Sequence, residues 1–306
     1  MSSNTEFELL FHLGAHKTAS THFERETRFQ IKKLKNENVR HLNKQLFRTT
    51  YRKYKKFWNY NTHQEIRTEL CLHKYSDTNF RKLLIFDENI LGGPRKAFKK
   101  GIMYPIAIKQ VSHLMKMVGS HKTTFSIAIR NPAFHIPSIY CESIRSSGIY
   151  TPFKKYIGKT DITSFSWSAL IRQIKNTIGD ATLIVWTYEK YNDLLPDLIN
   201  LYLDNEIDKN SFNPIHKSPI RVGLSEKALN EIKISMSKHS LLIRLLSKKT
   251  IRLSKEKIDT IMSRYPKSEK YPGIKLFNQE QIDMLSDNYK QDIQTISEMK
   301  DVVFID

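Results

Sequence analysis

The chain has 306 residues, of which 40% are hydrophobic and 26% are charged. This composition excludes a mainly disordered chain and is typical of a globular protein with a substantial core. No apolar run approaches the roughly 20 residues that a membrane-spanning helix needs, and the segment MSSNTEFELL lacks the pattern of a signal peptide. We therefore expect a cytoplasmic protein whose two cysteines, Cys71 and Cys141, stay reduced.

Basic residues far outnumber acidic ones, since 50 Lys and Arg against 31 Asp and Glu give a formal net charge of +19. Much of this excess lies in residues 25–56, called the basic run below, and a second basic stretch covers residues 238–257. Such a charge indicates either an anionic partner or a solvated, lysine-rich surface. No RNA-binding motif is present, so nucleic acid is not the expected partner, while peripheral membrane contact and the oligomeric state stay open.

Short apolar runs predict buried parallel strands, and helical patterns separate them. In chain order the predicted strands cover residues 7–13, 83–86, 124–129, 181–186 and 302–305. The predicted helices follow from Thr21, over residues 104–118, from Pro137 to just before Gly148, and over residues 164–178 and 192–203. Beyond residue 220 the chain reads as helical, with Ser225 as an N-cap and a closing helix that carries Leu285, Tyr289, Asp292 and Ile296.

The alternation of strands and helices predicts an α/β fold with a central parallel sheet flanked by helices, of the three-layer, P-loop-NTPase-like type. We expect a single domain over residues 1–306. Residues from about 30 to 80 are predicted to form a helical, basic insertion, and residues from about 205 to 306 a helical C-terminal region. The carboxyl ends of the strands should place four polar loops along one edge of the sheet, where such folds bind ligands.

The loop after the first strand has the residues of an anion cradle. Gly14 permits a tight turn, Lys17 supplies a positive charge, and Thr18, Ser20 and Thr21 supply hydroxyl donors at the start of a helix. The loop is not a Walker loop, because no glycine directly precedes Lys17. Asp87 is the nearest counterpart of a magnesium-binding aspartate, which keeps an ATP-dependent small-molecule kinase as an alternative.

The segment Gly14-Ala15-His16-Lys17-Thr18-Ala19-Ser20-Thr21 resembles the 5′-phosphosulfate loop of PAPS-dependent sulfotransferases, closest to a bacterial branch whose loop reads roughly GxHKTxTT. The resemblance implies PAPS (3′-phosphoadenosine 5′-phosphosulfate) as co-substrate, PAP as product and no metal. It implies that all eight residues of this loop bind the cofactor. Sulfuryl transfer, like phosphoryl transfer, needs in-line positioning and charge stabilisation, and Lys17 is the candidate for stabilising the leaving oxygen.

Two further segments resemble the same family. Arg130 ends a strand and Ser138 follows eight residues later, a pair that binds the 3′-phosphate of PAPS in the family. An arginine fork and a serine near a helix N-terminus both suit a phosphate, although a structural carboxylate partner and a helix cap would explain them too. Tyr188 resembles the strand-end tyrosine near the adenine, and a place in the core or rim is the alternative.

An acceptor hydroxyl also needs a base. Glu88, just after a predicted strand, is the first candidate, and an ion pair with Arg95 or Lys96 is the alternative. His16 is the second candidate, because the charge of Lys17 favours a neutral imidazole. His135 and Asp87 are less favoured candidates.

Together these features predict a sulfotransferase that moves a sulfuryl group from PAPS to a hydroxyl or amine. The expected acceptor is a small molecule or glycan, preferably an anionic carbohydrate precursor that the basic run could attract. The kinase and a non-catalytic nucleotide- or RNA-binding protein of the same fold are the alternatives.

Overall fold

The computed structural model describes residues 7–54, 80–99, 102–215, 223–244 and 252–306. Six strands form one parallel sheet in the order β2-β3-β1-β6-β7-β8. Their bounds are Glu8–His12 for β1, Val39–His41 for β2, Lys82–Phe86 for β3, Thr123–Ile129 for β6, Thr182–Thr187 for β7 and Val303–Ile305 for β8. The predicted three-layer α/β fold with a central parallel sheet is therefore confirmed.

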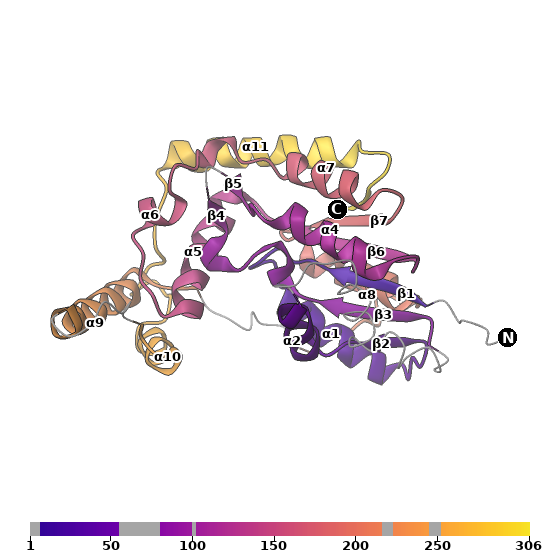
Figure 1. The fold of residues 1–306 in the computed structure, drawn as a ribbon, viewed down its shortest axis with the longest axis horizontal. Coiled ribbons are helices and arrows are strands. Elements are labelled where there is room, and N and C mark those ends of the chain that lie inside the picture. Colours follow the sequence, from indigo (N-terminus) through magenta and orange to yellow (C-terminus); the bar gives the residue numbers. More distant parts are fainter. Residues whose placement is uncertain (1–6, 55–79, 100–101, 216–222, 245–251) are drawn as a thin grey trace.

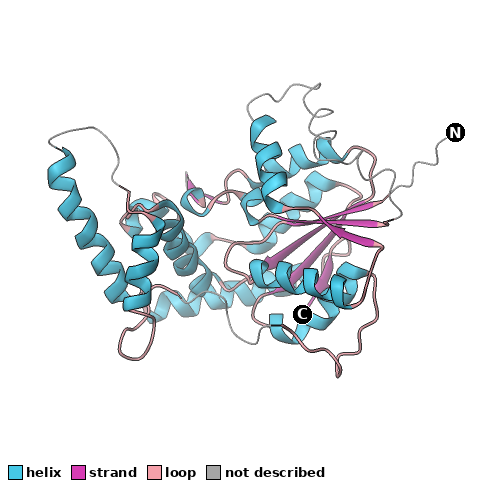
Figure 2. Ribbon diagram, turned by 90° about the horizontal axis from the view of Figure 1, so that it is seen from below, coloured by secondary structure: helices cyan, strands magenta, loops and turns pink. Residues whose placement is uncertain are grey.

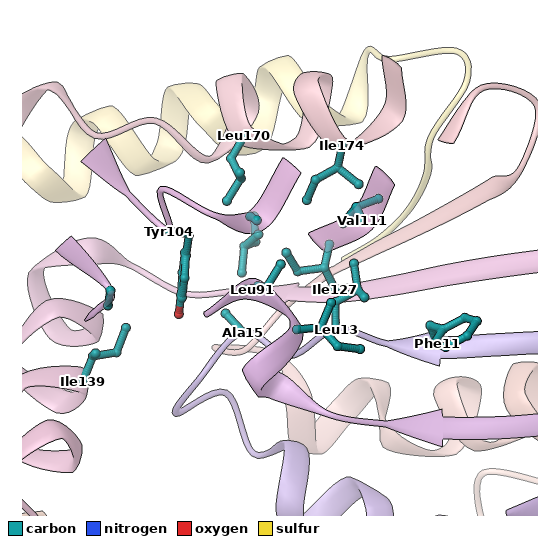
Figure 3. Packing of buried hydrophobic residues seen from close by; sticks show 14 of the residues in the cluster. Phe11, Leu13, Ala15, Leu91, Tyr104, Val111, Ile127, Ile139, Leu170 and Ile174 are labelled. Carbon is teal, nitrogen blue, oxygen red and sulfur yellow. The ribbon is translucent and has the colours of Figure 1, made fainter. Parts of the chain in front are cut away.

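Helices cover both faces of this sheet (Figure 1). On one face lie α1 (Ser20–Lys33) and α8 (Tyr191–Leu203), and on the other lie α4 (Ala107–Val118), α7 (Trp167–Ile178) and α11 (Gln279–Ser297). The strands supply both cores because successive side chains point to opposite faces. Leu9, Phe11 and Leu13 join the core under α4 and α7, part of which Figure 3 shows, whereas Leu10 joins the core with Phe23 of α1.

Helix α5 (Pro132–Ser147) begins five residues earlier than predicted. The side chain of Asn131 caps the helix by accepting the amide of Ala133 at 3.0 Å, and Pro132 takes the first helical position. Pro137, predicted as that first position, lies inside the helix. Pro132 and Pro137 both suit the first position of a helix. The helix begins at Pro132 because Asn131 caps it there. The predicted end is confirmed, since Gly148 follows the helix with a φ of +69°.

The remaining helices lie beyond the carboxyl edge of the sheet or beside it. They are α2 (Lys44–Tyr54), α6 (Phe153–Ile157), α9 (Glu226–Arg244) and α10 (Lys255–Arg264), and Figure 2 shows α9 and α10 far from the sheet. Ser225 caps α9 as predicted, because its hydroxyl accepts the amide of Ala228 at 3.1 Å. The closing helix α11 buries the four residues predicted for it, Leu285, Tyr289, Asp292 and Ile296.

Short elements complete the described chain: a pair of antiparallel strands, β4 (Phe98–Lys99) and β5 (Ile102–Met103), and the 3₁₀ helices η1 (Glu88–Leu91), η2 (Pro94–Lys96) and η3 (Ile162–Ser164). Within the predicted insertion at 30–80, Val39–His41 adds the edge strand β2 to the sheet, and α2 is helical. Residues 55–79 of that range, with Cys71, lie outside the described residues, as do residues 245–251 of the second basic stretch.

Among the described helices, none has the combination of length and apolar character needed to cross a bilayer. Cys141 of α5 is a free thiol.

Candidate functional site

A cleft of about 1240 Å³ lies at the carboxyl edge of the sheet. The residues that follow β1, β3, β6 and β7 all contribute to its lining, together with α5 and the segment from Pro272 to Ile282. The chain passes from β3, beside β1, to β6, on the other side of β1. Parallel sheets bind ligands where the strand order reverses in this way, and the cleft lies at that point of the sheet.

The first residues of the β1–α1 loop shape the turn. Gly14 has a φ of +105°, and a Cβ there would lie 2.9 Å from the Cβ of Glu88, so only glycine fits. The amide of Ala15 donates to the carbonyl of Ala128 on β6 at 3.1 Å, and the amide of Ala128 donates to Gly14. Gly14 and Ala15 therefore continue the pairing of β1 with β6, and neither lines the cleft.

Two of the loop hydroxyls also serve the loop itself. Thr18 is fully buried and donates to the carbonyl of Ala15 at 2.8 Å, and it does not line the cleft. Ser20 donates to the same carbonyl at 3.2 Å and contacts Nε2 of His12 at 3.1 Å, but it does line the cleft. The structure thus places Ser20 and Thr21 at the cleft, and it directs the Thr18 hydroxyl inward.

Helix α1 begins without a capping side chain. Its N-cap is Ala19, in a left-handed conformation with a φ of +62°, and the first turn contains no acidic residue. Alanine is a poor N-cap, and the first amides of any helix lack an intrahelical acceptor. The amides of Ser20 and Thr21 stand at this start, beside the cleft. An anion would satisfy them and would interact favourably with the helix dipole.

Lys17 stands at the cleft between the loop and α5. Its Nζ lies 3.7 Å from Oε2 of Glu142, and both side chains are largely buried at the cleft wall. Glu142 was not singled out from the sequence. It lies one turn beyond Ser138 on the same face of α5, so only the position of α5 reveals its relation to Lys17.

Arg130 and Tyr188 form a stacked pair at the ends of β6 and β7. The guanidinium carbon lies 4.3 Å from the centroid of the tyrosine ring, and Nη1 donates to the carbonyl of Lys17 at 2.8 Å. Nε of Arg130 is buried and has no hydrogen-bond partner among the described residues. Burial lowers the pKa of this guanidinium. The fold therefore brings together three residues predicted to bind the cofactor, Arg130, Tyr188 and Lys17. Nε of Arg130 is a buried donor that has no acceptor among the described residues.

Ser138 lines the same cleft, but not at a helix N-terminus. Because α5 begins at Pro132, Ser138 lies in its second turn, and the expected help from unpaired helix amides is absent there. The prediction that Ser138 lies near a helix N-terminus is therefore wrong, because the helix begins at Pro132 and not at Pro137. The hydroxyl remains at the cleft as a donor.

Glu88 lies at the cleft in a group of charges from α1 and α2. One carboxylate oxygen is 3.5 Å from Nζ of Lys44 and the other is 3.6 Å from Nη2 of Arg48. Glu88 thus forms ion pairs, as in its alternative interpretation, but with residues of α2 and not with Arg95 or Lys96. Burial by itself would raise the pKa of Glu88, but nearby positive charge, first that of Lys44, lowers it from 4.5 to about 2. Glu88 is therefore ionised at neutral pH, and it is a weak proton acceptor while these ion pairs persist.

His16 lines the cleft, although its side chain is buried. Its Nε2 lies 3.3 Å from Oδ1 of Asn89 and its Nδ1 lies 3.3 Å from the hydroxyl of Tyr104. Burial lowers the pKa of His16 and outweighs neighbouring carboxylates, first Glu88, that raise it. The imidazole is neutral as expected, but burial rather than the charge of Lys17 is the main cause.

The two less favoured base candidates, Asp87 and His135, do not line the cleft. Both carboxylate oxygens of Asp87 accept from Nε of Arg48 at 3.0 Å, and His135 is fully buried.

Several cations lie at the cleft, two from the basic run and two that were not predicted. Arg48, Lys267 and Lys275 line it, and Lys44 reaches Glu88 beside it. In contrast, Lys32 and Lys33 end the 14-residue helix α1, roughly 20 Å along its axis from the start at the cleft. In the described part of the basic run, Arg48 of α2 lines the cleft and Lys44 of α2 lies beside it. In the described residues, no group of three or more His, Cys, Asp and Glu side chains is placed to hold a metal ion.

Comparisons with known proteins add little to this geometry. Neither a protein-family model nor a curated protein matches the sequence. The crystal structure of a sulfotransferase from Alicyclobacillus acidocaldarius is similar to the chain with a TM-score of 0.35 and 12% identity, over 77% of this chain and 95% of that chain. A similarity of this size assigns no function.

Proposed function

We propose that the protein is a PAPS-dependent sulfotransferase that moves a sulfuryl group to a hydroxyl or amine of an acceptor, with an anionic carbohydrate as the preferred acceptor. One observation carries the proposal. Two groups whose chemistry suits an anion face one cleft, namely Lys17 with the uncapped start of α1, and Arg130 stacked on Tyr188. PAPS carries separate anionic groups at its 3′ and 5′ positions, and it would supply the activated sulfuryl group.

The residues at the cleft fit such a co-substrate. The amides of Ser20 and Thr21 would hold the 5′-phosphate, and Lys17 would stabilise charge on the leaving oxygen. Arg130 would bind the 3′-phosphate, which gives its buried Nε an acceptor, with the hydroxyl of Ser138 as a second donor. The hydroxyls of Thr18 and Ser20 and the amide of Ala15 are already paired, and these hydrogen bonds would keep the loop rigid before any ligand binds.

Glu88 is the proposed general base. It is ionised, as a base requires, and it lies against Gly14 at the turn of the loop. Its ion pairs with Lys44 and Arg48 would weaken as it takes a proton from the acceptor. Lys267 and Lys275 also line the cleft and would attract an acidic acceptor, in place of the distant lysines of α1.

The contacts of Asp87 support this proposal over a kinase. Asp87 is the nearest counterpart of a magnesium-binding aspartate, but both of its oxygens accept hydrogen bonds from Arg48. The non-catalytic alternative predicts RNA binding with a steep dependence on salt. The cytoplasmic location is part of the proposal.

Thermal shift with PAP, with ATP and magnesium, and with a short RNA separates these functions. We expect a large shift with PAP that Arg130→Ala abolishes. Arg172→Ala, on the exposed face of α7, is the matched control and should leave the shift unchanged. Transfer of radiolabelled sulfate from PAPS to a panel of glycans then tests the reaction. Stabilisation by ATP and magnesium alone would contradict the proposal.

A further inference from the structure

A chain of four buried or part-buried polar side chains runs behind the β1–α1 loop. Nε2 of His135 lies 3.4 Å from the Tyr104 hydroxyl, which lies 3.3 Å from Nδ1 of His16. Nε2 of His16 then lies 3.3 Å from Oδ1 of Asn89, at the cleft. Tyr104 and His135 have almost no exposed surface, so their hydrogen bonds must be made with other protein groups and not with solvent.

The number of protons in this chain decides where each one lies. The amide of His16 donates to the Tyr104 oxygen at 3.3 Å, so that oxygen already accepts one hydrogen bond. Tyr104 has one proton to donate, and either His16 or His135 receives it. If His135 receives it, His16 carries its own proton on Nδ1, and its Nε2 lone pair faces the lone pairs of Asn89 Oδ1. With the Asn89 amide oriented so that Oδ1 faces His16, two acceptors would then face each other.

If His16 receives the proton from Tyr104, all the contacts are satisfied. Nε2–H of His16 donates to Asn89, and Nε2–H of His135 donates to the Tyr104 oxygen. The other ring nitrogen of His135 supports this arrangement independently. Nδ1 of His135 is buried and has no partner among the described residues. When Tyr104 donates to His16, Nδ1 of His135 carries no proton and is an acceptor without a donor. When Tyr104 donates to His135, Nδ1 carries the proton and is a donor without an acceptor. Buried N–H groups without an acceptor are rarer than buried acceptors without a donor.

We propose that His16 presents its Nε2–H to the cleft as a neutral hydrogen-bond donor, and that Tyr104 and His135 are positioning residues that hold it in this tautomer. The role in catalysis rests on the proposed function. When a ligand binds, Nε2–H of His16 would exchange its acceptor, Oδ1 of Asn89, for an anionic sulfuryl or phosphate oxygen beside Lys17. This donor would stabilise the charge that develops on that oxygen. His16 is thereby removed from the base candidates, and the general base is Glu88.

The surroundings of His16 keep this donor neutral. The charged groups that act on it are the carboxylates of Glu88, Asp87 and Glu142, which favour an imidazolium. Burial opposes them and prevails, so the pKa of His16 is lowered. A neutral donor gives direction without adding a second full charge next to Lys17.

Nitrogen NMR of the protein labelled in its histidines tests the tautomer without any ligand. The His16 signals, assigned through His16→Gln, should show a protonated Nε2 and an unprotonated Nδ1 at neutral pH. In Tyr104→Phe this pattern should change to a mixture of tautomers. A protonated Nδ1 or an imidazolium in the unaltered protein would overturn the proposal.

Activity of two His16 variants tests the role. Glutamine keeps an N–H donor but cannot act as a base, whereas alanine keeps neither. If His16 acts as a donor, kcat should fall by about 100- to 1000-fold in His16→Ala, whereas His16→Gln should keep most of the kcat of the unaltered protein. Equal losses would contradict the donor role. His113→Gln, in α4 and away from the cleft, is the control. If PAP neither binds nor reacts while the NMR pattern holds, the proposed function fails and the tautomer stands.

Discussion

The guanidinium of Arg130 lies over the ring of Tyr188, with its central carbon 4.3 Å from the ring centroid. The two residues follow adjacent parallel strands, β6 and β7, and the amide of Tyr188 donates to the carbonyl of Ile129 at 2.8 Å. The sheet thus holds the ring in place, and the ring holds the guanidinium plane. Nε stays buried beside the cleft without a protein acceptor among the described residues, which prepares Arg130 for an anion.

Removing the ring should weaken the binding of PAP without abolishing it. Tyr188→Leu loses a cation–π contact of about 0.5–2 kcal/mol, which corresponds to an increase in Kd of roughly 2- to 30-fold. Arg130→Ala also removes the positive charge and should bind PAP more weakly than Tyr188→Leu does. Isothermal titration with PAP measures both. An unchanged Kd in Tyr188→Leu would mean that the stack does not position Arg130 for the ligand.

Replacing Lys17 should affect turnover more than binding. Lys17→Met removes the charge proposed for the leaving oxygen, so we expect kcat to fall by about 100- to 1000-fold, as for the loss of one strong stabilising donor. Lys17→Arg keeps the charge and should retain more activity. Steady-state kinetics with PAPS resolve kcat from KM. If only KM rises in Lys17→Met, then Lys17 binds the ground state and does not act in transfer.

The acid limb of the pH–rate profile should depend on Lys44. Because the pKa of Glu88 is lowered to about 2, this carboxylate stays ionised as the pH falls from 7 to 4, and kcat/KM should not decline through it. Lys44→Met removes the nearest positive charge, so burial then raises the pKa of Glu88 and the acid limb moves to higher pH. If the acid limb of the pH–rate profile is the same in the unaltered protein and in Lys44→Met, Glu88 is not the base. The exposed Lys116 of α4 supplies the control, Lys116→Met.

Acid should destabilise the fold through buried neutral histidines. Burial lowers the pKa of His41 from 6.5 to about 3, so the unfolded chain binds a proton in that interval and the folded chain does not. Stability from His41 is therefore complete above pH 6.5 and declines by about 1.4 kcal/mol per pH unit as the pH falls toward 3. His41→Gln should reduce the slope by this amount. Urea unfolding at pH 7 and pH 5 measures it, and identical slopes would contradict the account.

Asp292 of α11 should be needed for the start of α7. Its carboxylate accepts the amides of Trp167 at 2.7 Å and Ser168 at 3.0 Å, together with the hydroxyl of Ser166 at 2.7 Å. Asp292→Ala leaves these donors without their acceptor, and we expect a loss of about 2–3 kcal/mol in the free energy of unfolding. Chemical denaturation measures it. Asp287→Ala, an exposed change on the same helix, should cost less than about 0.5 kcal/mol.

Sequence reasoning was most accurate where the signal is local. Gly14 after an apolar run, Gly148 after a helix and the buried face of α11 all follow from neighbouring residues, and the structure confirms them. It was less accurate where two local signals compete, as at Pro132 and Pro137. The edge strand β2 has only three residues, too few to show a strand period, and its pairing with β3 defines it.

The sequence by itself determined the α/β fold class, five of the six strands of the sheet, and the loop whose residues suggest an anion. The tertiary structure decided what each polar side chain does. Thr18 turns inward, Arg48 and Lys44 reach Asp87 and Glu88 across about 40 residues of chain, and Tyr104 reaches His16 across 88 residues. The reason is physical. The pKa of a carboxyl and the tautomer of an imidazole depend on burial and on partners a few ångströms away, and only the folded chain brings those partners together.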